Sequence, residues 1–246
     1  MSALTNRWNR SWRWLWRATL TLVIAYALLL TYPQPLFAYE LRHAGVVLHA
    51  DRPIPIAMRA TLDRVRARLN RSPVADATRV QDVFLCQSRW RFALFARNNY
   101  RVGGIANVYI GQQVFVRESD MEHDRLIGPG GRPVAADRPL SYFIAHEIMH
   151  IEHGRVLGRL GYIRLPQWAD DGHADYVARD IDLAEALRGF TSGAAALDPA
   201  RSGLYLRYQL MVAYLIDKQH VGPMTLLTHP PDRATVDRDL RGLASW

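Results

Sequence analysis

The chain has 246 residues, enough for one globular domain of ordinary size together with one membrane or targeting segment. Hydrophobic residues make up 49% and charged residues 22%, and these shares argue against a disordered chain and a coiled coil. The net charge of +8 does not indicate a nucleic-acid partner, because the arginines after Glu40 are interspersed with Asp and Glu. Cys86 is the only cysteine, which excludes an internal disulfide and a cysteine-based zinc site.

An uncharged apolar segment, residues 18–30, follows a basic and aromatic N-terminus. Arginines and indole rings together are typical of the cytoplasmic end of a membrane helix, because arginines are retained inside and indoles lie at headgroup depth. We therefore predict a basic cytoplasmic N-terminus at 1–17, a transmembrane signal anchor at 18–38 and one globular domain at 40–246. The basic and aromatic residues in question are Arg7, Arg10, Arg13, Arg17, Trp12, Trp14 and Trp16.

The uncharged run is shorter than the roughly 20 residues that span a membrane, and residues 31–38 or an extended Arg17 side chain would supply the missing length. A signal peptide cleaved after Ala38 is the main alternative, although Leu36 stands where a small residue is preferred. Both interpretations place the following domain outside the cytoplasm. It would be anchored in a bacterial inner membrane and face the periplasm, or be secreted after cleavage. A buried core helix is the third interpretation.

Residues 53–117 predict a half of mixed α/β structure. Residues 53–72 place apolar side chains close to helical spacing, with arginine at other positions. Residues 83–86 and 89–96 are predicted as two strands, and residues 107–117 as two short strands or one bulged strand.

Residues 118–137 are rich in glycine, proline and acidic residues, and we predict a loop without regular structure there. A helix is then predicted with Asp137 as N-cap, Pro139 in its first turn and a stop at Gly154. Two further helices complete a helical C-terminal half and are predicted at 166–182 and 202–219. The predicted fold class is α+β, with a mixed N-terminal subdomain and a helical C-terminal subdomain behind one N-terminal membrane helix.

The motif that carries chemistry lies in the first of these helices and reads His146-Glu147-Ile148-Met149-His150. Residues four apart lie on one helix face with Cβ atoms roughly 6 Å apart, so both histidines can bind one ion. Zinc (Zn2+) accepts nitrogen and oxygen ligands, and a catalytic zinc site uses three ligands from the protein. Glu147 lies beside the first ligand, where its carboxylate can deprotonate water as a general base.

Chance produces this pattern in roughly one such chain in a hundred, but here it falls in an apolar segment with helix start and stop signals. Two histidines and a glutamate on a buried helix would be costly without a metal or polar partners. His153 lies too far along the helix to share the ion with both histidines, and we interpret it as exposed or as a support for a ligand. Glu152 is interpreted as solvated. Val156 stands where metzincins have their third histidine, which excludes that subclass.

A third ligand is expected within residues 165–176, and here the chain resembles the gluzincin metallopeptidases, in particular the peptidase MA-like group. In that family a Pro-x-Trp-x-x-Glu-Gly-x-Ala-x-Tyr helix supplies the third zinc ligand. The matching residues are Pro166, Trp168, Gly172, Ala174 and Tyr176. The resemblance implies a zincin-like domain, and Asp171 stands where the family has its ligand glutamate. His173 and Asp170 are the alternatives, and His173 lies about 200° round the helix from Asp171.

An aspartate is one methylene shorter than a glutamate, so the two ligand-bearing helices would have to approach closely, and Gly172 would permit that approach. Asp175 lies one turn beyond Asp171, which suits a carboxylate that orients a ligand histidine through its other ring nitrogen. A solvated surface aspartate is the alternative for this position.

Two further expectations come from the resemblance. It implies a hydrogen-bond donor to the attacked carbonyl oxygen from the C-terminal helices, and Tyr205 is the candidate, with a core aromatic as the alternative. The strand at Val114–Val116 resembles the edge strand on which zincins align an extended peptide, and the glycine-rich loop after it would border the cleft.

The sequence therefore predicts a zinc metallopeptidase acting on a peptide or protein, with zinc held by His146, His150 and Asp171 and with Glu147 as the general base. One alternative is a non-catalytic zinc-binding module. The other is a zinc hydrolase that acts on a non-peptide amide of the cell envelope.

Overall fold

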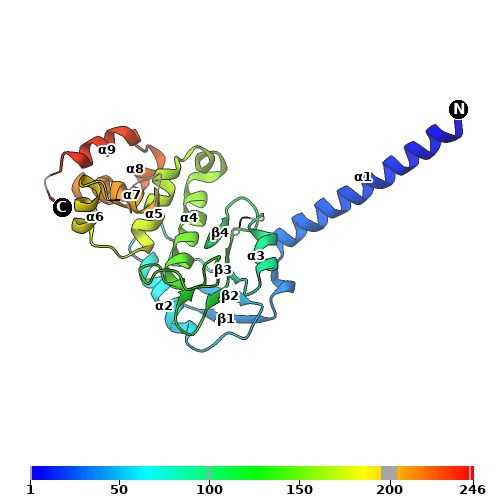
Figure 1. Ribbon diagram of the computed structural model, residues 1–246, viewed down its shortest axis with the longest axis horizontal. Coiled ribbons are helices and arrows are strands. Elements are labelled where there is room, and N and C mark those ends of the chain that lie inside the picture. Colours follow the sequence, from blue (N-terminus) through cyan, green and yellow to red (C-terminus); the bar gives the residue numbers. More distant parts are fainter. Residues whose placement is uncertain (1, 98, 100, 195–203, 244) are drawn as a thin grey trace.

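Figure 1 shows the computed structural model of the chain, which describes residues 2–97, 99, 101–194, 204–243 and 245–246. A long N-terminal helix projects from a body that has a β-sheet on one side and a group of helices on the other. Helix α4 (Leu140–Arg164) runs between these two parts. The fold is mixed α+β with a helical C-terminal half, as predicted.

The projecting element is helix α1 (Ser2–Thr31), and the side chains of its residues 12–28 are exposed. The segment Trp12–Thr31 is long and apolar enough to cross a membrane, and 6% of it is buried. The interpretation of this segment as a buried core helix is therefore wrong. This helical segment extends the uncharged run by residues 12–17 and by Thr31, and residues 32–38 lie outside the helix.

The C-terminal end of α1 is attached to the body. Leu30 is buried in a cluster with Phe37 and Phe84, and Tyr26 Oη donates a 2.7 Å hydrogen bond to the carbonyl of Leu94. These contacts fix where the projecting helix leaves the body.

One sheet of five strands forms the body's first layer. The strands are β1 (Tyr39–His43), β2 (Val46–Ala50), β3 (Gln81–Leu85), β4 (Gly104–Asn107) and β5 (Gln113–Val116). Their order is β1-β2-β3-β5-β4, with the three inner strands parallel and both edge strands antiparallel to their neighbours. The predicted strand at 83–86 is β3, which begins two residues earlier. Within the segment 107–117 the prediction is only partly right: residues 113–116 form β5, residues 108–112 form a turn, and β4 lies almost wholly before the segment.

The prediction of a strand at 89–96 is wrong, because this segment forms helix α3 (Arg89–Phe95). Phe92 and Phe95 are both buried in one cluster with Phe115. Residues three apart share a face of a helix but point to opposite faces of a strand, so burial of both phenylalanines on one side of the sheet requires the helix.

The edge of the sheet beside the helices is β4 and not the strand at Val114–Val116. That segment is β5, which pairs with β3 on one side and β4 on the other, so its backbone groups are used within the sheet. The following segment is mostly loop as expected, but it contains a short hairpin of β6 (Ser119–Asp120) and β7 (Arg125–Leu126).

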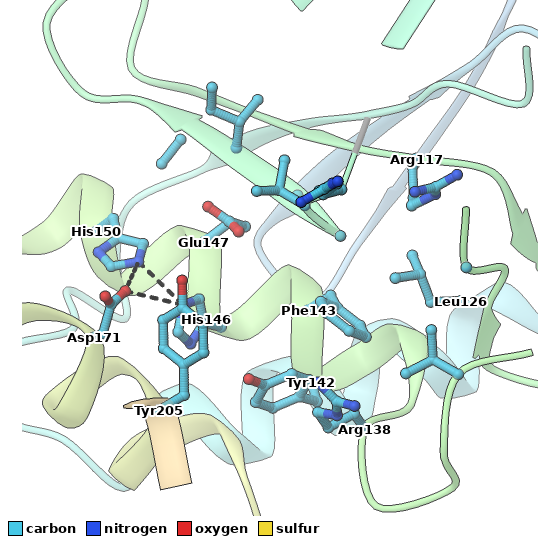
Figure 2. Close-up of a pocket in the computed structure, with 18 of the residues that line it drawn as sticks. Arg117, Leu126, Arg138, Tyr142, Phe143, His146, Glu147, His150, Asp171 and Tyr205 are labelled. Atoms are coloured by element: carbon cyan, nitrogen blue, oxygen red, sulfur yellow. Dashed lines mark hydrogen bonds and ion pairs between the residues drawn. The ribbon is translucent and has the colours of Figure 1, made fainter. Parts of the chain in front are cut away.

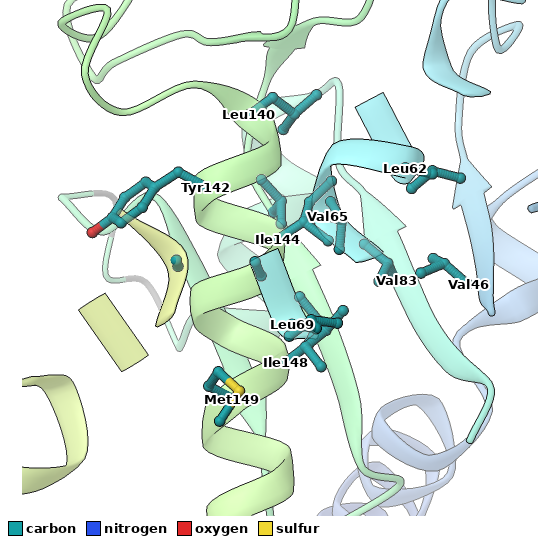
Figure 3. Packing of buried hydrophobic residues seen from close by; sticks show 14 of the residues in the cluster. Val46, Leu62, Val65, Leu69, Val83, Leu140, Tyr142, Ile144, Ile148 and Met149 are labelled. Atoms are coloured by element: carbon teal, nitrogen blue, oxygen red, sulfur yellow. The ribbon is translucent and has the colours of Figure 1, made fainter. Parts of the chain in front are cut away.

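The main core lies between this sheet and two helices, α2 (Met58–Leu69) and α4. Figure 3 shows one face of α4 packed on α2 and on the inner strands. The labelled side chains include Leu140, Ile144 and Ile148 of α4, Leu62, Val65 and Leu69 of α2, and Val46 and Val83 of the sheet. Burial of this face orients the motif histidines, which lie on another face of α4, away from the sheet core.

Both predicted ends of the motif helix differ from the structure. Asp137 forms an ion pair with Arg179, and the first turn is capped instead by Asp124, whose carboxylate accepts a 2.7 Å hydrogen bond from Ser141 N. The helix continues past Gly154, where a Cβ would lie 2.0 Å from Val108 Cγ1, so this glycine permits a close approach and does not end the helix. The break comes at Gly158, which has φ 65°.

The C-terminal half packs around a second core. Its helices are α5 (Gln167–Ala178), α6 (Leu183–Thr191), α7 (Leu204–Ala213) with the π-helical turn η3 (Tyr214–Lys218), α8 (Pro223–Thr228) and α9 (Arg233–Arg241). Gly172 of α5 permits a close approach, but to α7 and not to α4: a Cβ there would lie 2.7 Å from the carbonyl oxygen of Tyr208.

Candidate metal centre

Three side chains converge at the junction of α4 and α5. His146 and His150 lie one turn apart on α4, and their Nε2 atoms are 3.1 Å apart. Asp171 comes from α5, with its Oδ1 3.5 Å from His150 Nε2 and 3.8 Å from His146 Nε2. All three side chains are buried, and Figure 2 shows them directed toward one another at one end of a cleft. These residues could hold a metal ion.

The separations fit the dimensions of a zinc site. Zinc binds imidazole nitrogen and carboxylate oxygen at roughly 2.0–2.2 Å, so ligand atoms at tetrahedral corners lie roughly 3.3–3.6 Å apart. The three distances between the ligand atoms, from 3.1 to 3.8 Å, span that range. Two nitrogens and one oxygen form the donor set, which leaves a fourth corner for water or substrate.

The other ring nitrogen of each histidine faces a carboxylate. His146 Nδ1 lies 2.7 Å from Asp175 Oδ1, and His150 Nδ1 donates a 2.9 Å hydrogen bond to Asp170 Oδ1. Tyr142 Oη also donates to Asp175, at 2.6 Å, and holds that carboxylate in place. Because an ionised carboxylate only accepts, each Nδ1 carries the proton and each Nε2 directs a lone pair toward the common point.

These carboxylates also raise the pKa values of the two histidines. Burial lowers the pKa of His146, but Asp175 outweighs burial and the net pKa is raised. Burial likewise lowers the pKa of His150, and Asp170 overcomes it, so the pKa of His150 rises to about 10. The carboxylates around the two histidines therefore favour positive charge at this point, which a divalent cation would supply.

Glu147 lies beside this cluster and lines the same cleft. Its side chain is 8% exposed, and burial raises its pKa. Gly104 at the start of β4 lies against it, so that a Cβ at position 104 would be 2.6 Å from Glu147 Cγ and 2.9 Å from Oε1. The edge strand and the motif helix therefore hold the Glu147 carboxylate between them at the cleft wall.

Tyr205 reaches the cleft from α7. Its ring lies 6.2 Å from the ring of His146, centroid to centroid, and Figure 2 shows its hydroxyl pointing toward the ligand cluster. The side chain is partly exposed, which is not the environment of a core aromatic. Burial of the phenol, followed by the nearby Asp171, raises the pKa of Tyr205 to about 12, so its hydroxyl stays a hydrogen-bond donor at neutral pH.

Two alternative ligands lie outside this cluster. Asp170 bridges His150 and His153, whose Nδ1 donates a 2.6 Å hydrogen bond to it, and Tyr162 Oη donates to its other oxygen at 2.9 Å. His173 points away from His146 and contacts His153, with 2.8 Å between His153 Nε2 and His173 Nδ1. Asp170, His150 and His153 form a second group that could hold a metal, but Asp170 already accepts three hydrogen bonds there.

Solvent exposure, which was considered for His153, Glu152 and Asp175, is excluded by their burial. His153 and His173 are fully buried, and burial lowers the pKa of each, so both rings are neutral. They belong to a series of hydrogen-bonded side chains that ends at Ser72. Glu152 is 1% exposed and accepts a 2.6 Å hydrogen bond from Gln81 on β3. Asp175 is not a solvated surface residue, because it is completely buried beside His146.

Asp170→Asn is expected to weaken zinc binding by roughly 10- to 100-fold, because removal of the negative partner of His150 loosens the ring and lowers its basicity. Competition with a chromophoric chelator measures the affinity. Tyr162→Phe is the matched control, since it removes one hydrogen bond from Asp170 and keeps the carboxylate. Equal zinc affinity in Asp170→Asn and the wild type would contradict this role.

The cleft has a volume of about 620 Å³ and is bordered by β4, α4, α5 and the glycine-rich loop, from which Gly128 and Pro129 contribute. That loop had been expected to border the cleft. Gly104 and Tyr142 were not anticipated from the sequence. The consecutive glycines 103 and 104 were a usable signal for the first, since glycine in a strand indicates close approach of another group.

Comparisons of the chain with protein-family models, with curated proteins and with solved structures found no match.

Proposed function

We propose that this protein is a zinc-dependent peptidase of the gluzincin type, with a zincin-like domain and an aspartate as the third ligand. The observation that carries the proposal is the convergence of His146, His150 and Asp171 at the end of a cleft whose wall holds Glu147. Zinc bound there would polarise the substrate carbonyl and acidify a water molecule. Zinc is favoured as the metal because two histidines four apart with an intervening glutamate are typical of zinc peptidases.

The chain's own groups account for the remaining steps. Glu147 accepts the proton of the attacking water and delivers it to the leaving amine, and its raised pKa suits a group that must both take and give a proton. The Tyr205 hydroxyl donates a hydrogen bond to the carbonyl oxygen as negative charge develops on it. Among the described residues β4 pairs with β5 alone, so the backbone groups on its other side, beside Glu147, would align an extended peptide across the cleft.

We further propose that α1 anchors the peptidase in a membrane with residues 40–246 on the outer side. The support is the exposed apolar surface of residues 12–28 and the arginines that precede the first acidic residue. An alternative with the same orientation is cleavage after Ala38 and secretion.

Metal analysis of the purified full chain, combined with turnover of a peptide library followed by mass spectrometry, tests the proposed activity. We expect one zinc per chain and cleavage that is lost with a chelator and restored by zinc. His146→Ala should lose the zinc, because one of the two nitrogen ligands is removed. Bound zinc without any peptide cleavage would favour the non-catalytic binding module or a hydrolase of non-peptide amides. A protein that binds no metal, or iron in place of zinc, would refute the proposal.

A further inference from the structure

The two ends of the cleft differ in charge. The acidic residues among its described lining side chains are Glu147, Asp170 and Asp171, and all three lie at the metal end. Figure 2 shows Arg117 beyond Phe143 from His150, and Arg138 beside Tyr142 on the other side of Phe143. The arginine side chains that line the cleft are Arg101, Arg117 and Arg138, and none of them belongs to the metal cluster. As far as side-chain charge is concerned, an anionic group is therefore favoured beside the arginines and disfavoured beside the three acidic residues.

Arg138 is half-buried just before α4, and its Nε is buried without a hydrogen-bond partner among the described residues. Two acids near Arg138, its chain neighbour Asp137 and Asp124 in the adjacent loop, are already paired. Asp137 forms an ion pair with Arg179, and Asp124 pairs with Arg64 at 2.9 Å and caps the helix. A buried guanidinium nitrogen without a partner is costly, and a ligand carboxylate would satisfy it.

Arg117 follows β5 and is 4% exposed. Its backbone N–H donates a 3.1 Å hydrogen bond to the carbonyl of Gly103, which fixes the residue beside the edge strand. Burial lowers the pKa of Arg117, followed by the nearby positive charge of Arg89, although the guanidinium keeps its charge at neutral pH. Glu118 is the next residue in the chain, but it does not line the cleft.

An apolar stretch joins the two ends. Phe143 lies one helical turn before Glu147, and Leu126 lies beside it in the cleft. A Cβ at Gly103 would be 2.4 Å from the Phe143 ring, so the backbone just before β4 lies directly against these apolar side chains. The first residue of α4 lies roughly 10 Å along the axis before Glu147, which equals about three residues of extended peptide.

We propose that Arg138 binds a carboxylate of the substrate, with Arg117 adding positive charge further along the cleft, so that the cleft selects peptides with an acidic group within three residues of the cleaved bond. This inference rests on the proposed function, because it takes a peptide as the substrate. The carboxylate comes either from a glutamate or aspartate side chain or from the free C-terminal end of the peptide, and Phe143 and Leu126 contact the apolar part of that residue.

The test measures binding separately from cleavage. The zinc-loaded Glu147→Gln variant is titrated into fluorescently labelled, alanine-rich peptides with both ends blocked, which carry glutamate or glutamine at successive positions. A further peptide has no acidic side chain but keeps a free C-terminal carboxylate. We expect the glutamate peptide, or the peptide with the free end, to bind about tenfold or more tightly than its neutral counterpart. Which of the two binds more tightly identifies the source of the carboxylate.

Arg138→Gln, introduced into the same background, should reduce the ratio of acidic to neutral binding nearly to one. Arg132→Gln is the matched control, because Arg132 is exposed, lies in the same loop and does not line the cleft. It should preserve the ratio and thereby exclude a general effect of net charge. Arg138→Lys should keep part of the preference, since it keeps the charge and loses the two-pronged hydrogen bonding.

Equal binding of acidic and neutral peptides, or a ratio that falls equally in Arg132→Gln, overturns the proposal. The wild-type cleavage pattern separates this failure from failure of the proposed function. Cleavage without acidic preference leaves a peptidase whose arginine end does not select substrate. If acidic peptides bind in a way that depends on Arg138 but are not cleaved, the carboxylate site is supported and the proposed peptidase activity is refuted.

Discussion

Glu147→Gln is expected to lower kcat/KM for peptide cleavage by about 10²- to 10⁴-fold, the range typical of loss of a general base. Glutamine has nearly the same shape as glutamate, but it cannot take a proton from water and return it to the leaving amine. Zinc content should be unchanged, because the converging ligand atoms belong to His146, His150 and Asp171. Initial rates on the best-cleaved library peptide, together with metal analysis, measure both quantities.

Glu122→Gln is the matched control for this substitution, since Glu122 is exposed in the loop before α4 and does not line the cleft. It should cleave as the wild type does. Retention of near-normal kcat/KM in Glu147→Gln would remove Glu147 from the proposed chemistry, even with zinc bound.

Gly104→Ala should reduce cleavage by roughly 100-fold, because a misplacement of about 1 Å at a reacting group has an effect of this size. The added methyl would lie 2.6 Å from Glu147 Cγ and 2.9 Å from its Oε1, which is closer than non-bonded atoms approach. Either the Glu147 carboxylate or the edge strand must move. The measurement compares kcat/KM with zinc affinity, and only kcat/KM should fall.

Gly130→Ala provides the matched control. A Cβ at this position, in the glycine-rich loop, meets nothing within 4 Å, so cleavage should not change. Unchanged cleavage in Gly104→Ala would show that the contact between β4 and Glu147 does not fix the carboxylate. Parallel loss of zinc and cleavage would instead indicate damage to the whole centre.

Part of the fold follows from local pattern. The helix at α2, the buried strand β3 and the helical C-terminal half were predictable, because their apolar side chains repeat at the spacing of the element that buries them. For the segment 89–96, the spacing of apolar residues gave a wrong prediction. Its alternating sequence fits a strand, but a single buried cluster receives both Phe92 and Phe95, and only a helix directs both there.

Predictions made from glycine positions were less accurate than those made from apolar spacing. Gly154 was expected to end a helix, yet it lies inside α4 where Val108 packs against the backbone. Gly172 was expected to bring α5 close to α4, and it brings α5 close to α7 instead. A glycine in a sequence indicates freedom or proximity, but the partner that comes close is decided by the packing of other elements.

The sequence by itself determined the part of the site that lies within one turn of helix. The spacing of His146 and His150 places both on one face, with Glu147 between them, because the helix repeat is fixed. The apolar N-terminal segment is likewise a property of consecutive residues. Only the tertiary structure decided among Asp170, Asp171 and His173, since these residues point in different directions from α5 and the packing of that helix on α4 and α7 selects which faces the histidines. Asp171 points toward the two Nε2 atoms of the histidines, and Asp170 accepts a hydrogen bond from His150 Nδ1. His173 is buried against His153.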